Sequence, residues 1–331
     1  MNQKDRIEWI DVVKGITIIL VVLGHSISGS GVMESKIENA ALIWKIIYRI
    51  ITSFHMPIFF FVSGYLYDRH NDEFSIEKYK SLIHNKFCDY IIPYVIFELL
   101  YVAFGIVTND QRYTVDAFLR SIYSPMSHFW FLYVLFFIHL IIPIVLYTIK
   151  NERLAILSFG ILTAYICDIL KYNGAFPLER ILYYSLFFLI GKYTSKAKIS
   201  LILTTPIKGG TVLVYLTLLA LEYKLSIEKI VLVKLLVACV AIYGVIGIFN
   251  IRRKFTFLEA IGKNTMPIYL IHSLFVSFFR SILGKFGIHN CSVIIIITCA
   301  AGVICPLMIG LYSRKKIIIN RLFYPRKYLK E

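Results

Sequence analysis

The chain has no polar stretch long enough to fold as a soluble domain. Instead, apolar runs recur along all 331 residues, 58% of which are hydrophobic, and the mean hydropathy is +0.71. Three of the longest runs are Ile16–Gly24, Val231–Phe249 and Val293–Gly310. Helices that are apolar on every side lie either in the core of a large protein or in lipid. Their repetition along the whole chain favours lipid and excludes a soluble protein.

Acidic residues are scarce, with 20 Asp and Glu against 36 Lys and Arg, so the formal net charge is +16. The basic residues fall between the apolar runs, and no polar domain is left over that would offer a basic face to a nucleic acid. Nucleic-acid binding is therefore not expected. Basic residues beside spanning helices orient a protein in a membrane, and some of them could also bind an anionic ligand.

Cysteine motifs are missing as well. None of the six cysteines forms a CxxC pair or a zinc-binding spacing, so we expect buried free thiols and no metal site. Internal repeats and low-complexity segments are also absent from the sequence. We therefore expect one membrane domain over residues 1–331.

The apolar runs predict an all-α integral membrane protein with about ten spans, if each span takes about 17 to 25 residues. The predicted spans lie near residues 11–29, 44–67, 88–107, 129–149, 153–170, 180–193, 211–223, 229–250, 266–283 and 291–313. With the N-terminus inside, about 23 basic residues fall on the cytoplasmic side and about 8 on the outer side. Both termini are therefore predicted to be cytoplasmic.

Three ionisable residues share one face of the first predicted span. At 100° per residue, Lys14 and His25 lie within about 20° of each other, and Asp11 lies within about 60° of both. A neutral imidazole within a span can take a proton from a hydroxyl group, because its pKa is near physiological pH. Lys14 could hold an anionic group. The alternative is that Asp11 and Lys14 pair at the headgroups while His25 makes a structural hydrogen bond.

Further polar side chains within or beside the spans are candidates for a substrate cavity, because ionisable groups in lipid are costly. They are His55, Ser63, His128, Trp130, Asn264, Tyr269 and His272. A structural role is the alternative for each, such as a buried histidine at His55 or an interfacial aromatic residue at Trp130. Glu98 and Asp168 are isolated acids, either of which could orient a base.

A basic segment precedes the third predicted span. Lys78, Lys80 and Lys86 lie here in what we interpret as a connector, and Pro93 and Tyr94 follow. Cations at a helix entry can bind phosphates such as those of coenzyme A. They can equally serve only to orient the chain, and the pattern alone does not decide between the two.

Several motifs together resemble the membrane acyltransferase-3 family. In that family a basic residue precedes a first-helix histidine by ten intervening positions, as Lys14 precedes His25. The sequence FHMPIFFFVSGYLY at residues 54–67 is most similar to the fucose 4-O-acetylase-like branch of the family. The blocks that carry the resemblance are Asp11-x-x-Lys14-Gly15, Val21–Ser26, Phe54–Leu66, Pro93-Tyr94, His128–Leu132 and Gly262–His272.

The resemblance implies transfer of an acyl group, usually acetyl, from a cytoplasmic acyl-CoA to a hydroxyl of a cell-surface carbohydrate or a lipid-linked glycan. His25 would be the base or a transient acyl carrier, with Lys14 and Asp11 at the same centre. Acetyl-CoA or another acyl-CoA would be a co-substrate, and no cofactor would be bound permanently. We expect a multi-pass protein of a bacterial cytoplasmic (inner) membrane, surrounded by membrane lipids. A homo-oligomer is left open.

The resemblance also assigns the coenzyme to the basic segment, with Lys14, Lys80, Lys86 and Tyr94 as candidate binding residues. The family often has two arginines ahead of the loop proline. The matching positions here are Lys86 and Tyr90, so the second cation is missing and Lys80 or Lys86 would serve alone.

Two other functions are compatible with parts of the pattern. A secondary transporter also buries histidines and acids near the middle of the membrane. Against it, the sequence has no internal repeat and no paired Gly/Pro interruptions in matching halves. A non-catalytic scaffold for envelope assembly would place no demand on His25 or Lys14.

Overall fold

The structure is a computed structural model that describes residues 8–33, 39–67, 74–108, 113–125, 127–172, 174–197, 205–227, 230–249 and 255–329. All regular elements within these ranges are helices, which confirms the predicted all-α class. Several basic residues that support the predicted orientation, among them Lys4, Arg6 and Arg69, lie outside the described residues. The two cytoplasmic termini stay a prediction.

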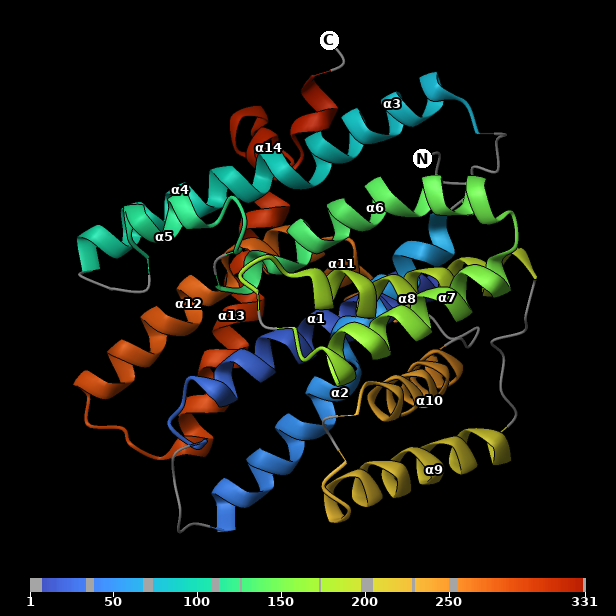
Figure 1. Cartoon of the computed structure of the whole chain (residues 1–331). Helices are drawn as coiled ribbons and strands as arrows, with labels where there is room; N and C mark the ends of the chain where they lie inside the picture. The colour runs from blue at the N-terminus through green and yellow to red at the C-terminus, as the bar shows by residue number, and fades with distance from the viewer. Residues whose placement is uncertain are drawn as a thin grey trace. The chain divides into compact units, whose positions relative to one another are not determined.

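The helices of the described ranges follow one another in the chain as shown in Figure 1. They are α1 (Glu8–Ser28), α2 (Asn39–Tyr67), α3 (Ile76–Lys86), η3 (Phe87–Ile91), α4 (Ile92–Thr108), α5 (Val115–Arg120), η4 (Ser127–Phe129), α6 (Trp130–Ile149), α7 (Glu152–Ala164), η5 (Tyr165–Ile169), α8 (Leu178–Lys196), α9 (Thr205–Lys224), α10 (Val231–Phe249), α11 (Thr256–Gly262), α12 (Thr265–Lys285), α13 (Cys291–Ser313), α14 (Ile317–Phe323) and η6 (Pro325–Tyr328).

Seven helices within the described residues are long and apolar enough to cross a membrane. They are Trp9–Ser28, Ala41–Tyr67, Ile76–Thr108, Ser127–Ile149, Val231–Phe249, Thr265–Lys285 and Cys291–Ser313. The three other predicted spans, 153–170, 180–193 and 211–223, are also helical, as α7 with η5, α8 and α9, but they do not belong to the seven. The count of about ten is therefore not confirmed. The seven apolar helices support a multi-pass membrane protein.

The chain forms two compact units. Unit 1 comprises Met1–Phe59, Ser200–Lys229 and Val233–Lys315. Unit 2 comprises Phe60–Ile199, Ile230–Leu232 and Lys316–Glu331. The prediction of one domain over residues 1–331 stays a prediction, and the two units are described separately below.

Glycines bring the helices of unit 1 into close contact around α1. A Cβ at Gly15 would overlap the carbonyl oxygen of Leu258 in α11, and a Cβ at Gly262 would overlap that of Asp11. A Cβ at Gly302 of α13 would come within 2.7 Å of Val22. Small residues allow such backbone approach between membrane helices. In this way α11, α12 and α13 pack against α1, and α12 and α13 lie side by side (Figure 1).

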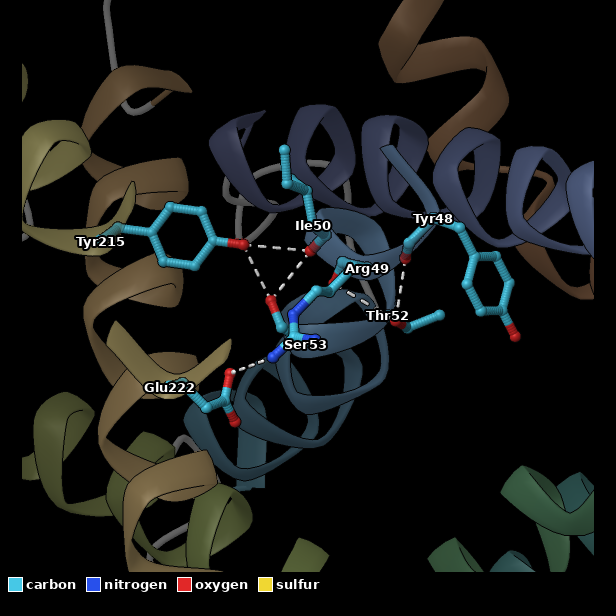
Figure 2. A network of polar contacts seen from close by, with 7 residues as sticks. All are labelled: Tyr48, Arg49, Ile50, Thr52, Ser53, Tyr215 and Glu222. Atoms are coloured by element: carbon cyan, nitrogen blue, oxygen red, sulfur yellow. Dashed lines mark hydrogen bonds and ion pairs between the residues drawn. The ribbon is translucent and has the colours of Figure 1, made fainter. Parts of the chain in front are cut away.

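A polar network joins α2 to α9 in unit 1, as Figure 2 shows. The guanidinium of Arg49 lies 3.6 Å from the carboxylate of Glu222, which is buried. One turn further along α2, the hydroxyl groups of Ser53 and Tyr215 are 2.8 Å apart. The Tyr215 hydroxyl also lies 3.1 Å from the carbonyl oxygen of Ile50. Polar contacts therefore hold α9 against α2.

The basic segment of unit 2 is helical, whereas we interpret it from the sequence as a connector between spans. Lys78, Lys80 and Lys86 lie on α3, which continues through the π-helical turn η3 into α4 as one helix from Ile76 to Thr108. Ser75 caps its N-terminus by accepting a hydrogen bond from the backbone N–H of Lys78. Lys, Glu and Asn are compatible with a helix although they lower its hydropathy. The end of the apolar run at residue 88 therefore does not mark the end of the helix.

Unit 2 packs α6, α7 and α8 together with the second half of α2. A Cβ at Gly64 of α2 would overlap the carbonyl oxygen of Phe188 in α8, and one at Gly191 would overlap that of Phe61. These two glycines permit backbone contact between the two helices. At one end of the α7–α8 hairpin, the carboxylate of Glu152 pairs with the ammonium groups of Lys192 and Lys196.

Candidate functional site

Two histidines from distant parts of the chain meet inside unit 1. The rings of His25 on α1 and His272 on α12 have centroids 5.1 Å apart, with a 47° angle between the ring planes. His272 is fully buried, whereas His25 is partly accessible. The glycine contacts of α1 with α11 and α13 hold the helix that carries His25. The structure therefore brings together two of the residues that the sequence predicts for the site.

The hydrogen bonds of His272 determine which of its nitrogens can accept a proton. Nδ1 lies 3.0 Å from the carbonyl oxygen of Ile268 and 2.8 Å from that of Tyr269. Carbonyl oxygens only accept hydrogen bonds, so Nδ1 carries the hydrogen. In the neutral ring the lone pair is then on Nε2. His272 is thus held in the tautomer that suits a base acting through Nε2.

Lys14 and Asp11 form an ion pair near the start of α1. Nζ of Lys14 lies 3.2 Å from Oδ1 of Asp11, whose side chain is buried. The pair stays next to α11, because the carbonyl of Asp11 occupies the space that a Cβ at Gly262 would need. Lys14 and His25 share the face of α1 that the sequence predicts, with ten residues between them.

Asn264 lies in the turn between α11 and α12 and is buried. Its amide nitrogen donates to the carbonyl of Ala260 at 2.7 Å, and its Oδ1 accepts from Arg314 at 2.9 Å. These contacts tie the beginning of α12 to the end of α13. Asn264 thereby helps to fix the helix on which His272 lies.

Two further predicted residues lie in the same unit. Nδ1 of His55 lies 2.7 Å from the carbonyl oxygen of Ile51, so it too carries its hydrogen on Nδ1. His55 is within electrostatic range of His25. The ring of Tyr269 lies 6.5 Å from that of His272, measured between centroids. His55 therefore lies near His25, and Tyr269 lies near His272.

The predicted coenzyme-binding residues Lys80, Lys86 and Tyr94 belong to unit 2. Lys80 is exposed on α3. Nζ of Lys86 lies 3.4 Å from the hydroxyl of Tyr90 and 5.3 Å from the centre of its ring. Tyr94 is buried, and its hydroxyl donates to the carbonyl of Ser121 at 2.8 Å. Lys80 and Lys86 are thus the more accessible members of this set.

Ser63, His128 and Trp130 also belong to unit 2. Ser63 is partly buried and precedes Gly64 on α2. His128 lies in the short η4 turn before α6, not within the helix, and it is buried with its ring 5.5 Å from that of Tyr101. Trp130 begins α6 and lies beneath the guanidinium of Arg180, at 5.1 Å from the ring centre. Their predicted role in acceptor binding stays a prediction.

The two isolated acids of the sequence have local partners in unit 2. Glu98 is fully buried, and its carboxylate accepts a short hydrogen bond from the hydroxyl of Ser121. Both carboxylate oxygens of Asp168 lie 3.2 Å from the backbone N–H of Val231, the first residue of α10. Glu98 is thus bound to a side chain of a later segment, whereas Asp168 caps the N-terminus of α10.

Sequence reasoning did not single out Arg49 and Glu222, although both lie within predicted spans. The signal was available, because two ionisable residues of opposite charge within apolar runs tend to pair. The contact of Arg314 with Asn264 was likewise not predicted from the sequence. In each case the partner is distant in sequence, so the local pattern does not reveal it.

Chemically, the paired imidazoles can accept and pass protons or take up an acyl group, which are the usual roles of histidine in group transfer. The described residues contain no group of three or more His, Cys, Asp or Glu side chains that could hold a metal ion.

Comparisons with known proteins bear on the family of this chain. The family model described as an acyltransferase domain, that of acyltransferase-3, matches residues 7–311. A search of curated proteins and a search of solved structures found no similar chain. The matched range includes α1, α12 and both histidines of the pair. With its apolar helices and with a match over most of its length, the chain belongs to the acyltransferase-3 family of membrane acyltransferases.

Proposed function

We propose that this protein transfers an acyl group, in the first instance acetyl, from cytoplasmic acyl-CoA to a hydroxyl group of an envelope carbohydrate or lipid-linked glycan. The observation that carries this proposal is the contact between His25 and His272 in unit 1 of a chain that belongs to an acyltransferase family. Acyl transfer to a hydroxyl needs a group that removes the proton of that hydroxyl, and imidazole suits this task near neutral pH.

The second histidine favours a reaction in two steps. In the first, one ring nitrogen of His25 attacks the thioester carbon and the carbon–sulfur bond breaks. The coenzyme leaves as a thiol with the proton that the other ring nitrogen of His25 gives up. In the second, the acceptor oxygen attacks the acyl carbon while Nε2 of His272 takes the hydroxyl proton. The bond between the acyl carbon and His25 breaks, and His272 passes the proton to the released ring of His25, so that both imidazoles are neutral again. An acylated His25 cannot itself act as the base in this second step, so a neighbouring imidazole is needed.

A one-step reaction is the alternative within the same function. His25 would then act only as the base for the acceptor hydroxyl, and the acceptor oxygen would attack the thioester directly. In both versions a cation helps to hold the anionic donor, and Lys14 is the candidate in unit 1. Lys80 and Lys86 of unit 2 remain predicted to bind donor phosphates, a role argued from their charge and accessibility on α3.

Mass spectrometry of the cell-envelope glycans tests the function. Cells that carry the intact gene are compared with cells that lack it, and with cells that produce His25→Ala protein at the same level in the membrane. We expect an acetyl mass increment on one glycan species only with the intact gene. Identical glycans in all three strains, or full acylation with His25→Ala, would contradict the proposal. Uptake of a labelled solute by the purified protein, without any acyl transfer, would support a transporter instead.

A further inference from the structure

Arg280 on α12 contacts the end of α1 that carries His25, within unit 1. Its Nη1 donates a hydrogen bond to the carbonyl oxygen of Gly29 at 2.8 Å, and its Nη2 donates to Oγ of Ser277 at 3.4 Å, one turn earlier on α12. We propose that Arg280 is a positioning residue for acyl transfer, which fixes the last turn of α1 and thereby the setting of His25 against His272. This inference rests on the proposed function and adds a residue to its site.

His25 lies in the part of its helix that is held least firmly by the helix itself. It belongs to the last turn of α1, which ends at Ser28. Helix ends fray readily, and their last carbonyl groups receive no N–H from a following turn. The carbonyl of His25 accepts from the N–H of Gly29 at 3.0 Å and from the hydroxyl of Ser28 at 3.2 Å. The carbonyl of Gly29 comes after the helix has ended, and Arg280 supplies its donor.

Both the charge of Arg280 and the absence of a side chain at Gly29 suit this contact. The C-terminal end of a helix carries a partial negative charge, and basic side chains that bind its last carbonyls stabilise it, most strongly where they are partly buried. Arg280 is partly buried. A Cβ at Gly29 would overlap Nη1 of Arg280 and would lie 3.1 Å from its Cζ. Glycine at position 29 therefore leaves the space that the guanidinium group occupies.

Arg280 and His272 reach the same stretch of α1 from one helix. Gly29 follows His25 by four residues, which is about 6 Å along the axis of α1 and about 40° around it. Arg280 follows His272 by eight residues, which is about 12 Å along α12 and about 80° around it. A long side chain on a helix leans toward the N-terminus of that helix, which makes up the remaining offset. The two contacts therefore follow in the same order on both helices and hold α1 at two points.

The second contact restricts movements that the ring contact leaves open. With only the rings of His25 and His272 in contact, the last turn of α1 could rotate or shift along its axis. The hydrogen bond from Arg280 opposes both movements. Transfer of a proton or an acyl group needs its atoms in place, and a misplacement of about 1 Å can slow a reaction about 100-fold. Since this contact is made to the backbone of α1, its loss should lower kcat and leave KM nearly unchanged.

Acetyl transfer by the purified full-length protein tests this proposal, with labelled acetyl-CoA and an envelope glycan fraction as substrates. Arg280→Gln should lower kcat about tenfold and change KM for acetyl-CoA less than about twofold. Lys285→Gln is the matched control, since it removes the same charge from an exposed position in the last turn of the same helix. It should change kcat less than about twofold. Wild-type kcat in folded Arg280→Gln, or a raised KM with wild-type kcat, would overturn the proposal.

Gly29→Ala provides a second variant, which decides the matter if Arg280→Gln does not fold. It keeps the arginine but moves the guanidinium group away from the carbonyl of residue 29, because the added Cβ takes its space. Its kcat should also fall by about tenfold. Gly284→Ala on α12 is the control, since no atom lies within 4 Å of its added Cβ. Equal kcat in these two glycine variants would overturn the proposal.

The same measurement in a His272→Gln background separates positioning from general stabilisation of the fold. If Arg280 acts by setting His25 against His272, Arg280→Gln should slow the His272→Gln protein by less than about twofold more. Two effects that multiply would show that Arg280 only stabilises the fold, and they would overturn the proposal. These results all presuppose transfer by wild type. A wild type that transfers no acetyl group would instead contradict the proposed function, and the role of Arg280 with it.

Discussion

His25 and His272 lie with their ring centroids 5.1 Å apart, although they are carried by the first helix of the chain and by one near its end. The glycine contacts of α1 with α11 and α13 make this meeting possible, and two backbone carbonyls fix the orientation of His272. A pair of imidazoles can divide a two-step transfer, with one as acyl carrier and the other as base.

Replacement of His272 by glutamine should slow acyl transfer about 100-fold, because the base of the second step is lost while the volume of the side chain is nearly kept. If His25 is the acyl carrier, the acylated protein should then accumulate. Rapid quenching after mixing with labelled acetyl-CoA measures both quantities. His289→Gln is the control, since His289 is an exposed histidine after α12. Equal rates in the two variants would contradict the role of His272.

Gly262→Ala should destabilise unit 1 strongly, because the added Cβ would overlap the carbonyl of Asp11 and force α11 away from α1. We expect a loss of at least about 2 kcal/mol, as for other overpacked sites. Gly284→Ala on α12 is the matched control. No atom lies within 4 Å of its added Cβ, so the gain in helix propensity should stabilise by about 0.5 to 1 kcal/mol. Thermal unfolding in detergent distinguishes the two, and equal stability would count against the close contact.

Arg49→Ala should destabilise the contact between α2 and α9 by about 3 kcal/mol, because the buried carboxylate of Glu222 loses its partner. Glu222→Gln in the same protein should recover part of this loss, since the uncompensated charge is removed. The interaction energy of the double-mutant cycle gives the coupling. Additive effects of the two substitutions would show that the pair contributes nothing.

The stability of the α7–α8 hairpin should depend on pH through Glu152, which lies just before the predicted span. Burial alone would raise the pKa of this carboxyl, but Lys192 and Lys196 outweigh that effect and the pKa is lowered below its ordinary 4.5. A lowered pKa means that the unfolded state binds the proton more readily, so stability is present above pH 4.5 and is lost as the pH falls below it.

The unfolding temperature of wild type and of Glu152→Gln, recorded from pH 7 down to the acid limit of the detergent, measures this dependence. The difference between the two proteins should be largest near neutral pH and should shrink as the pH falls. Other carboxylates titrate in both proteins and cancel in the difference. A difference that stays constant with pH would contradict the ion pair with the two lysines.

The sequence predicts the long apolar helices where the signal is local, whereas the roles of the site residues stay predictions. The apolar runs of α1, α2, α6, α10, α12 and α13 agree with helices of the structure, and both His25 and His272 were predicted. Their contact was not predictable, because it depends on glycine packing between helices that are far apart in the chain. The limits of α3 were missed because Lys and Asn lower hydropathy without ending a helix.

The number of spans decides the sides on which the termini lie. Seven spans would place the two termini on opposite sides of the membrane, whereas the prediction of about ten places both in the cytoplasm. The seven helices of the structure and the ten predicted spans agree only if three further segments also cross the membrane, namely α7 with η5, α8 and α9. In α8, charged residues near both ends lower the hydropathy. They are Glu179, Arg180, Lys192 and Lys196.

The rate of acetyl transfer from labelled acetyl-CoA to an envelope glycan fraction, measured with equal amounts of purified wild-type and His25→Ala protein, tests the central role of His25 most directly. Both proteins should show the same thermal unfolding in detergent before the comparison. We expect transfer by wild type and at least about a 100-fold lower rate for the variant. Equal transfer by two equally folded proteins would contradict the assignment of His25 as the catalytic residue.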